Sequence, residues 1–319
     1  MKTNAKKNIS VFIQCYLSVF ITKWSPYKLS RWYIHLLGNF FYILNKREKK
    51  TIEEIIISRL SNKYDLKELN RIIKLYFAGM FDHYHEKIIA AYSDIKLIKS
   101  YFDKNIQIEN LEILNEAFNQ NKGVILITAH YGAVEFLPET LSFKGYPLTM
   151  IIRFKTNKLK KATLDRANQL NAKVLDPENS IIINDIINHL KQGRVLFTQC
   201  DEFDIWRPFK NRETIFLGDR HNGDKTLDVI AKRSKSPAVM ALLERRRNGR
   251  YCLKFYRISV SNEDDNLTIF EKTMLILEDN IYKHPEQWYQ WNKLEKGIEE
   301  GSNEDIQNQN VLCENPLSI

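Results

Sequence analysis

The stretch NKGVILITAHYGAVEFLP, residues 121–138, combines residue types and a spacing suited to acid–base chemistry. An apolar run that ends at Thr128 is followed by His130, a glycine-containing turn and Glu135. The point where a strand ends and a helix begins is where open α/β sheets bind ligands. If the helix returns the carboxylate of Glu135 to the imidazole, the carboxylate fixes the tautomer and leaves the other ring nitrogen free as a general base. The alternative is a histidine that only caps the turn.

Apolar periodicity predicts the elements that must position these residues. Beyond residue 105, short apolar runs alternate with helical patterns, and the runs VILIT and VLFTQ are apolar enough for a sheet covered on both faces. We expect strands at 106–108, 124–129, 148–153, 173–175, 195–199, 214–217, 238–243 and 252–256. We expect helices at 111–119, 134–143, 158–170, 181–191, 225–233 and 267–283. The sequence therefore predicts an α/β fold in which a mixed central sheet is flanked by helices.

A long helix is predicted upstream of the sheet. Residues 66–92 carry apolar side chains at intervals of three and four. The same stretch contains His83, His85 and Glu86. Histidines two positions apart point to different faces of a helix, so we predict polar residues on a partly buried helix rather than a metal site.

The charge of the chain is concentrated at its N-terminus. The net charge of +9 equals that of residues 1–50, where ten Lys and Arg stand against one acid, Glu48. The same region contains an apolar run of about 14 residues at 9–22, shorter than the ~20 that span a bilayer. A second stretch at 29–45 is rich in Trp, Tyr and Phe. Aromatic rings beside cations are typical of helices at a membrane surface, which predicts an N-terminal helical membrane-docking region. Two core helices of a soluble protein are the alternative.

Other features divide the chain and exclude several classes of protein. The four cysteines lie far apart without a CxxC pair, which disfavours a zinc ribbon, a redox motif and a disulfide scaffold. The segment ERRRNGR, residues 244–250, lies between two predicted strands, which favours a solvated hairpin turn over a nucleic-acid contact. Residues 297–319 contain five acids and no Lys or Arg, which predicts a disordered acidic tail. We therefore expect membrane-associated helices at 1–50 and an α/β domain at 51–296.

Several segments together resemble one known family. The segment AHYGAVE resembles the His-x4-acid motif of the glycerolipid-type acyltransferases, and residues 10–293 are similar to their lipid A late acyltransferase (lauroyl/myristoyl acyltransferase) branch. The further matching segments, in order, are FYILNKREKKTIEEIIISRL, IIKLYFAGMFDHYHEKI, the stretch from FTQCDEFD through IFLG to LDVIAKRSKSPAV, and HPEQWYQWNK. The last resembles the closing Pro-Glu-Gln-x-x-x-Trp signature. Ala129 stands where many lipid A enzymes have Asn, which indicates a divergent member.

The resemblance implies an O-acyltransferase. A fatty acyl chain would pass from a thioester of acyl carrier protein or coenzyme A to a hydroxyl of a membrane glycolipid, as in lipid A and lipopolysaccharide biosynthesis. His130 would be the general base and Glu135 would orient it, with no cofactor beyond the thioester and no metal. The backbone N–H groups after His130 are candidates for stabilising the oxyanion. Arg153 and Arg166 match basic positions that would bind acceptor phosphate. Asp201 matches the acid after the family's central strand, and a structural role for it is the alternative.

The resemblance also implies where the protein works. It places the chain at the inner membrane, peripheral or N-terminally anchored, with its site facing the cytoplasm. The expected partners are a lipid acceptor, acyl carrier protein and an anionic membrane surface, and no nucleic acid. Two alternatives stay open. One is an acyltransferase for another lipid or a secondary-metabolite acceptor, and the other is a non-catalytic basic protein that binds lipid or nucleic acid.

Overall fold

The computed structural model of the chain describes residues 9–13, 15–154, 157–177, 182–202, 209–259 and 267–294. The predicted acidic tail at 297–319 lies outside the described residues. The expected segment boundaries after residues 50 and 296 stay a prediction.

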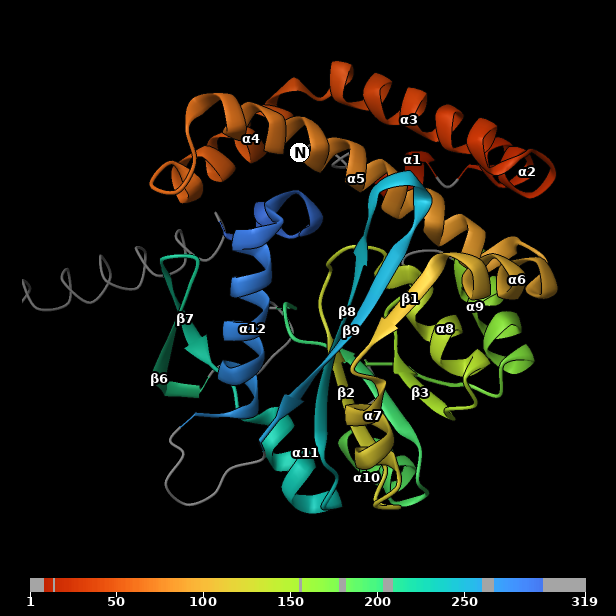
Figure 1. Ribbon diagram of the computed structural model, residues 1–319, viewed down its shortest axis with the longest axis vertical. Helices are drawn as coiled ribbons and strands as arrows, with labels where there is room; N and C mark the ends of the chain where they lie inside the picture. The colour runs from red at the N-terminus through yellow and green to blue at the C-terminus, as the bar shows by residue number, and fades with distance from the viewer. Residues whose placement is uncertain are drawn as a thin grey trace, which may run out of the picture.

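The centre of the molecule is a seven-stranded sheet with the order β1-β9-β8-β2-β5-β3-β4 (Figure 1). Its strands are β1 (Ile106–Glu109), β2 (Val124–Thr128), β3 (Leu148–Ile151), β4 (Lys173–Leu175), β5 (Val195–Gln199), β8 (Ala238–Arg245) and β9 (Tyr251–Ile258). Strands β8, β2, β5, β3 and β4 run parallel, whereas β9 is antiparallel to β8 and parallel to β1. The predicted mixed sheet is therefore confirmed. Strands β6 (Phe209–Phe216) and β7 (Asp219–Gly223) form a separate antiparallel pair.

Helices cover both faces of the sheet, which explains its apolar central strands. All five residues of β2 are buried. Ile125 and Ile127 enter one hydrophobic cluster, and Val124 and Leu126 enter the other, because successive strand residues point to opposite faces. The apolar run VILIT therefore predicted correctly that helices cover both faces of the sheet.

The two clusters involve different helices. One face packs against α6 (Ile95–Asn105), α7 (Leu111–Phe118), α8 (Leu137–Phe143) and α9 (Asn157–Gln169). The other packs against α10 (Ile182–Lys191), α11 (Thr226–Ser234) and α12 (Ile269–Lys283). Short 3-10 helices lie at η1 (Val134–Phe136), η2 (Arg247–Gly249) and η3 (Pro285–Gln287). The predicted helix at 134–143 thus begins as the 3-10 turn η1. The sequence did not predict β7, because DRHNG lacks apolar alternation.

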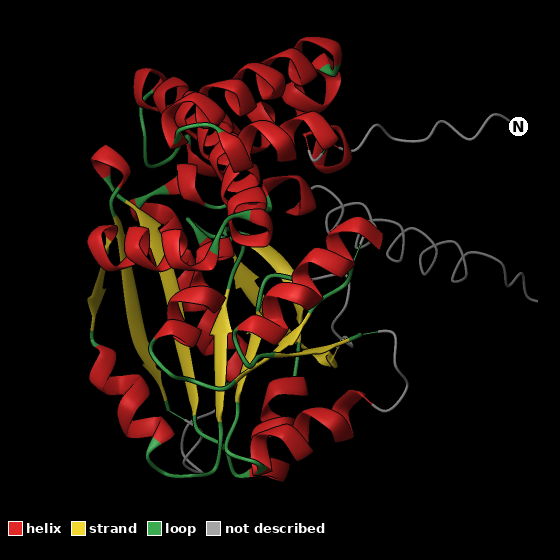
Figure 2. Cartoon of the chain, turned by 90° about the vertical axis from the view of Figure 1, so that its right-hand side faces the viewer, coloured by secondary structure: helices red, strands yellow, loops and turns green. Residues whose placement is uncertain are grey.

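A layer of N-terminal helices lies over the carboxyl ends of the parallel strands (Figures 1 and 2). Its members are α1 (Ile9–Ile13), α2 (Tyr16–Trp24), α3 (Tyr27–Leu44), α4 (Lys46–Leu60) and α5 (Leu66–Tyr92). The predicted long helix coincides with α5. The apolar run at 9–22 forms parts of two helices, α1 and α2, rather than one continuous helix.

Helix α3 has two apolar sides with different surroundings. One side packs on α5, where Gly38 lies so close to Phe81 that a Cβ would overlap its ring. The other side leaves large apolar residues exposed, among them Trp32 (62%) and Ile43 (62%). Among the described residues, none of the helices combines the length and the apolar character that crossing a membrane requires. Helix α3 therefore contributes to the core with one side and presents an apolar face with the other.

Candidate active site

The register of two neighbouring strands brings His130 and Asp201 together. Strands β2 and β5 pair in parallel with Thr128 opposite Gln199, and the N–H of Cys200 donates to the carbonyl of Thr128 at 2.9 Å. His130 and Asp201 each come two residues after their strand. Because parallel strands end at the same edge of a sheet, the two side chains meet there.

The imidazole of His130 lies between two carboxylates. Its Nδ1 is 3.0 Å from Oδ1 of Asp201, and its backbone N–H donates to Oδ2 of Asp201 at 2.9 Å. Its Nε2 is 3.2 Å from Oε1 of Glu202, whose other oxygen is 2.7 Å from Nζ of Lys293. The side chain of His130 is 19% exposed and that of Asp201 is fully buried. One ring nitrogen is thus held from inside the protein, and the other faces a partly exposed side chain.

Asp201 is a buried carboxylate with several donors. Besides the two groups of His130, the indole N–H of Trp288 donates to Oδ2 at 2.9 Å. Burial raises the pKa of Asp201, but the imidazole and the donated hydrogen bonds outweigh burial, so the net shift is downward. Asp201 therefore stays ionised beside His130.

Glu135 points elsewhere than the sequence predicted. Its Oε1 lies 2.9 Å from Nζ of Lys87 and 3.5 Å from Nε2 of His83, both on α5. The cause is the turn before it: Gly132 has a φ of 56°, and the next residues form η1 rather than an α-helical turn. The expected hydrogen bond to His130 is made by Asp201 instead. Burial raises the pKa of Glu135, but the ammonium group of Lys87 outweighs burial, so the net shift is downward.

The backbone after His130 is also engaged. The N–H groups of Tyr131, Gly132 and Ala133 donate to carbonyl oxygens at 2.7, 2.8 and 2.8 Å, and two of these belong to Gln287 and Leu243. A Cβ at position 132 would overlap the carbonyl of Leu243, which explains the glycine. The prediction that these N–H groups are available to an oxyanion is therefore contradicted in this structure.

The two candidate arginines lie in different surroundings. Arg166 on α9 is 7% exposed, and its guanidinium donates to the carbonyls of Ala90, at 2.9 Å, and Ser93, at the C-terminus of α5. Its donors thus satisfy terminal carbonyls of a helix, which argues against the predicted phosphate contact. Arg153 is exposed two residues beyond β3, at the same edge of the sheet as His130.

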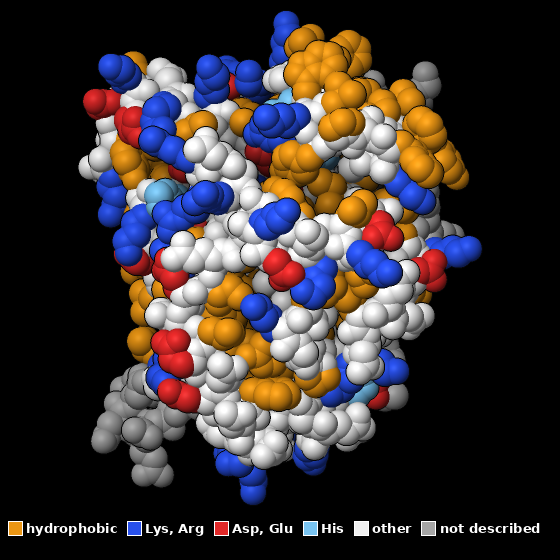
Figure 3. Space-filling model, turned by 45° about the vertical axis from the view of Figure 1, so that its right-hand side comes forward, with side chains coloured by type: hydrophobic (Ala, Val, Ile, Leu, Met, Phe, Trp, Pro, Cys, Tyr) orange, Lys and Arg blue, Asp and Glu red, His pale blue; other side chains and the backbone are white. Residues whose placement is uncertain are grey.

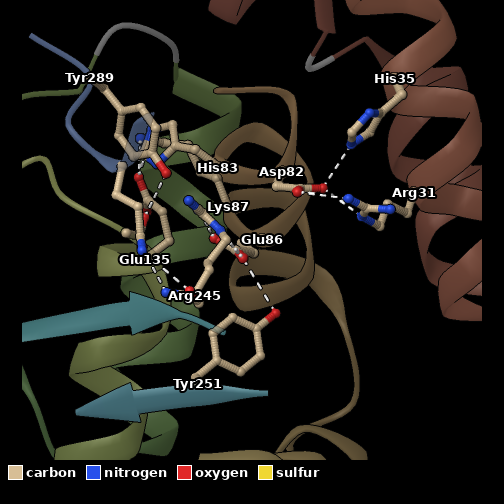
Figure 4. A network of polar contacts seen from close by, with 12 residues as sticks. Arg31, His35, Asp82, His83, Glu86, Lys87, Glu135, Arg245, Tyr251 and Tyr289 are labelled. Carbon is tan, nitrogen blue, oxygen red and sulfur yellow. Dashed lines mark hydrogen bonds and ion pairs between the residues drawn. The ribbon is translucent and has the colours of Figure 1, made fainter. Parts of the chain in front are cut away.

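Helix α5 joins the site to helix α3 of the same N-terminal layer (Figure 4). Asp82 accepts two hydrogen bonds from Arg31 of α3, from Nε at 2.6 Å and from Nη2 at 2.9 Å. Nε2 of His35 lies 2.7 Å from the same carboxylate. The carboxylate therefore fixes α3 against α5.

One turn further, α5 is tied to the sheet. Glu86 is 1% exposed and forms a bidentate ion pair with Arg245, with Nε at 2.8 Å from Oε1, and Tyr251 donates to Oε1 at 3.3 Å. The predicted hairpin is present, with the N–H of Arg246 donating to the carbonyl of Arg250 at 2.7 Å. Arg245 differs from the prediction of a solvated turn, because its side chain is 14% exposed and paired.

The histidines of α5 point to different neighbours, as predicted. The ring of His83 lies 4.9 Å from that of Tyr289, and Nε2 of His85 lies 2.8 Å from Oγ of Ser30. Both are buried more completely than predicted, and burial lowers their pKa values to about 3 for His83 and about 4 for His85. Within the described ranges, no group of three or more His, Cys, Asp or Glu could hold a metal ion.

The closing segment of the described chain braces the loop of His130. The N–H of Tyr289 donates to the carbonyl of His130 at 2.9 Å, and its hydroxyl donates to the carbonyl of Gly132 at 2.9 Å. Gln287 accepts from the N–H of Arg245 at 2.7 Å. Sequence reasoning did not assign Trp288 to the site. The one available signal was its position inside the closing signature.

These features define an α/β enzyme with a histidine–carboxylate pair at the carboxyl edge of a parallel sheet. The chain belongs to the bacterial lipid A biosynthesis acyltransferase family, whose model matches residues 6–294. The resemblance inferred from the motifs is therefore confirmed, and the protein is an acyltransferase that acts on a lipid acceptor. A search of the curated proteins found no match.

Proposed function

We propose that the protein transfers a fatty acyl chain from a thioester of acyl carrier protein or coenzyme A to a hydroxyl of a lipid A-type glycolipid, with His130 as the general base. The contact between Nδ1 of His130 and the ionised Asp201 carries this proposal. A carboxylate on Nδ1 selects the tautomer whose Nε2 lone pair accepts a proton, and it stabilises the imidazolium that results.

The reaction then needs no nucleophilic side chain. Nε2 of His130 takes the proton of the acceptor hydroxyl, and the hydroxyl oxygen forms a bond to the carbonyl carbon of the thioester. The tetrahedral intermediate collapses, the carbon–sulfur bond breaks, and the thiolate takes the proton from the imidazolium. An ester and a free thiol are the products. During this reaction the hydroxyl of the acceptor would replace Glu202 as the partner of Nε2 of His130.

Glu135 remains in the proposal as a second carboxylate. Its negative charge would favour the imidazolium that forms on His130, because a protonated His130 is among the groups that lower the pKa of Glu135. We assign it an electrostatic role that acts on His130 through space, rather than the orienting role, which falls to Asp201. Arg153 remains the candidate for acceptor phosphate, because it lies at the same sheet edge as His130.

The proposal includes docking on the cytoplasmic face of an anionic inner membrane. The docking face consists of exposed apolar residues of α2 and α3: Tyr16, Leu17, Phe20, Trp24, Leu29, Trp32, Leu36, Phe40, Ile43 and Leu44. Figure 3 shows hydrophobic side chains gathered at the upper right of the molecule. Exposed cations, including Lys23 and Lys28, flank the face. An apolar face beside cations favours an anionic bilayer over a neutral protein partner.

Replacing His130 by Ala tests the base. We expect acyl transfer from labelled acyl carrier protein to a lipid A precursor in mixed micelles to fall at least about a thousandfold, because the substitution removes the proposed base. The matched control is His284→Ala, since that side chain is 40% exposed and lies at the end of α12. A His130→Ala protein with the parental melting temperature and most of the parental activity would sink the proposal.

A further inference from the structure

The position of Asp201 depends on more than His130. Oδ1 faces Nδ1 of His130, whereas Oδ2 accepts from the backbone N–H of His130 and from the indole of Trp288, both at 2.9 Å. The torsion that orients an Asp carboxylate is soft and roughly two-fold, so a carboxylate keeps one orientation only where its donors fix it. The donor that comes from outside the His130 loop is Trp288.

We infer that Trp288 is a positioning residue for the acid–base pair, an inference that rests on the proposed function. Its N–H occupies Oδ2 and thereby leaves Oδ1 directed at the imidazole. Trp288 itself touches neither acceptor nor thioester in this assignment. It acts through Asp201, which holds His130 in the orientation that exposes Nε2.

The surroundings of Trp288 suit this role, because the same segment also holds the His130 loop. The indole is 0% exposed and packs edge-on against Phe216 at 5.5 Å and Trp291 at 5.1 Å. The next residue, Tyr289, donates its N–H to the carbonyl of His130. One short segment thus fixes the end of β2 through the backbone and the end of β5 through the indole. The spacing of the pair is therefore set by a third element as well as by the sheet.

The chain contains an internal comparison for Trp288. Trp291 is equally buried, packs against the indole of Trp288 and donates its own indole N–H, but to the carbonyl of Pro285 at 3.3 Å. Loss of either indole removes buried apolar contacts and one hydrogen bond. Only the loss of Trp288 removes a donor from Asp201.

The test compares Trp288→Phe with Trp291→Phe in full-length protein. We expect kcat to fall about tenfold to a hundredfold for Trp288→Phe with little change in KM, and to stay within about twofold of the parent for Trp291→Phe. In the proton NMR spectrum, we also expect the resonance of the His130 Nδ1–H, which is hydrogen-bonded to Asp201, to shift in Trp288→Phe and not in Trp291→Phe. Equal kcat losses in both variants, with an unchanged resonance, would overturn the inference.

A second substitution at position 288 separates the loss of the indole N–H from any loss of folding or packing. Incorporation of benzothienylalanine at position 288 keeps the size of the indole and replaces its N–H by sulfur. We expect the same fall in kcat, and parental kcat would contradict the inference. Asp201→Asn and His130→Ala separate this result from the proposed function. If they abolish transfer while both Trp288 variants are fully active, only the role of Trp288 fails, whereas an active His130→Ala protein removes the proposed function itself.

Discussion

At the scale of single residues, two acids compete for the role of orienting His130. Glu135 lies five positions after the histidine, whereas Asp201 lies 71 positions away. Asp201 accepts hydrogen bonds from the ring and from the backbone of His130, whereas Glu135 contacts Lys87 and His83 of α5. The proximity in sequence therefore favoured one acid and the three-dimensional contacts favour the other.

The contrast predicts unequal effects of two isosteric substitutions. Asp201→Asn should lower kcat about a thousandfold, because the amide neither selects the productive tautomer nor stabilises an imidazolium. Glu135→Gln should lower kcat about tenfold, because it removes a charge that acts on His130 through space. Steady-state kinetics at saturating acceptor measure both. A larger loss for Glu135→Gln, at equal melting temperatures, would return the orienting role to Glu135.

The residues of the site were predictable to different degrees. His130 follows from its place at the end of an apolar strand, and that reasoning needs no tertiary information. The partnership with Asp201 depends on β5 lying beside β2, although β3 and β4 come between them along the chain. Strand order is a tertiary property, so the sequence indicated Asp201 as a candidate residue but did not predict its hydrogen bond to His130. The contact of the Arg166 guanidinium with the end of α5 was not predictable for the same reason, because nothing in the local sequence indicates it.

At the scale of elements, α5 is the helix that connects the other N-terminal helices to the sheet. Its residues 82–87 contact α3 through Asp82, the sheet through Glu86 and the turn η1 through Lys87. Its 27 residues were predictable because their apolar periodicity is long and continuous. The 3-10 geometry of η1 was not predictable, because it depends on the close contact of Gly132 with β8. That difference decided where Glu135 points.

Buried neutral histidines on α5 predict acid sensitivity of the fold. Burial lowers the pKa of His83 to about 3 and that of His85 to about 4, from an ordinary value of 6.5. Below that ordinary value the histidines bind protons in the unfolded chain but not in the folded chain, so their contribution to stability is complete above about pH 7 and is lost as the pH drops towards 4. Each histidine contributes a slope approaching about 1.4 kcal/mol per pH unit.

Urea unfolding between pH 7.5 and 4.5 measures this slope. His85→Gln keeps a nitrogen for Ser30 but does not titrate, so its free energy of unfolding should fall less steeply with acid than that of the parent. A variant as steep as the parent would contradict the assignment of the slope to His85. At pH 7.5, the difference in the free energy of unfolding between His85→Gln and the parent measures how much the substitution destabilises the protein apart from titration.

At the scale of the whole molecule, the N-terminal layer has the site on one side and the docking face on the other. Helix α5 contacts the elements around His130, and α2 and α3 lie outside it (Figures 1 and 4). An acceptor anchored in the bilayer would therefore meet the protein on the side of the sheet where the strands end. Within this layer, helices α2 and α3 carry three Lys and Arg and no acid, and the first five residues of α4 add four more Lys and Arg against one acid, Glu48.

This arrangement predicts that two kinds of substitution weaken membrane binding differently. Lys23→Gln with Lys28→Gln should weaken binding to phosphatidylglycerol vesicles about 30-fold, because each cation near an anionic surface contributes about 1 kcal/mol. The same double variant should bind phosphatidylcholine vesicles as the parent does. Trp32→Glu should weaken binding to both kinds of vesicle, since it places a charge in the apolar face.

The matched control for the charge substitutions is Lys232→Gln with Lys235→Gln. These two lysines are also exposed, but they lie at α11, at the opposite end of the molecule from α3 (Figure 1). Because charges beyond a Debye length of about 8 Å are screened at physiological salt, this pair should leave vesicle binding unchanged. Co-sedimentation at fixed salt measures all the variants. If the α11 pair weakened binding as much as the Lys23 and Lys28 pair, attraction would depend on net charge alone, and no particular face of the protein would be turned towards the membrane.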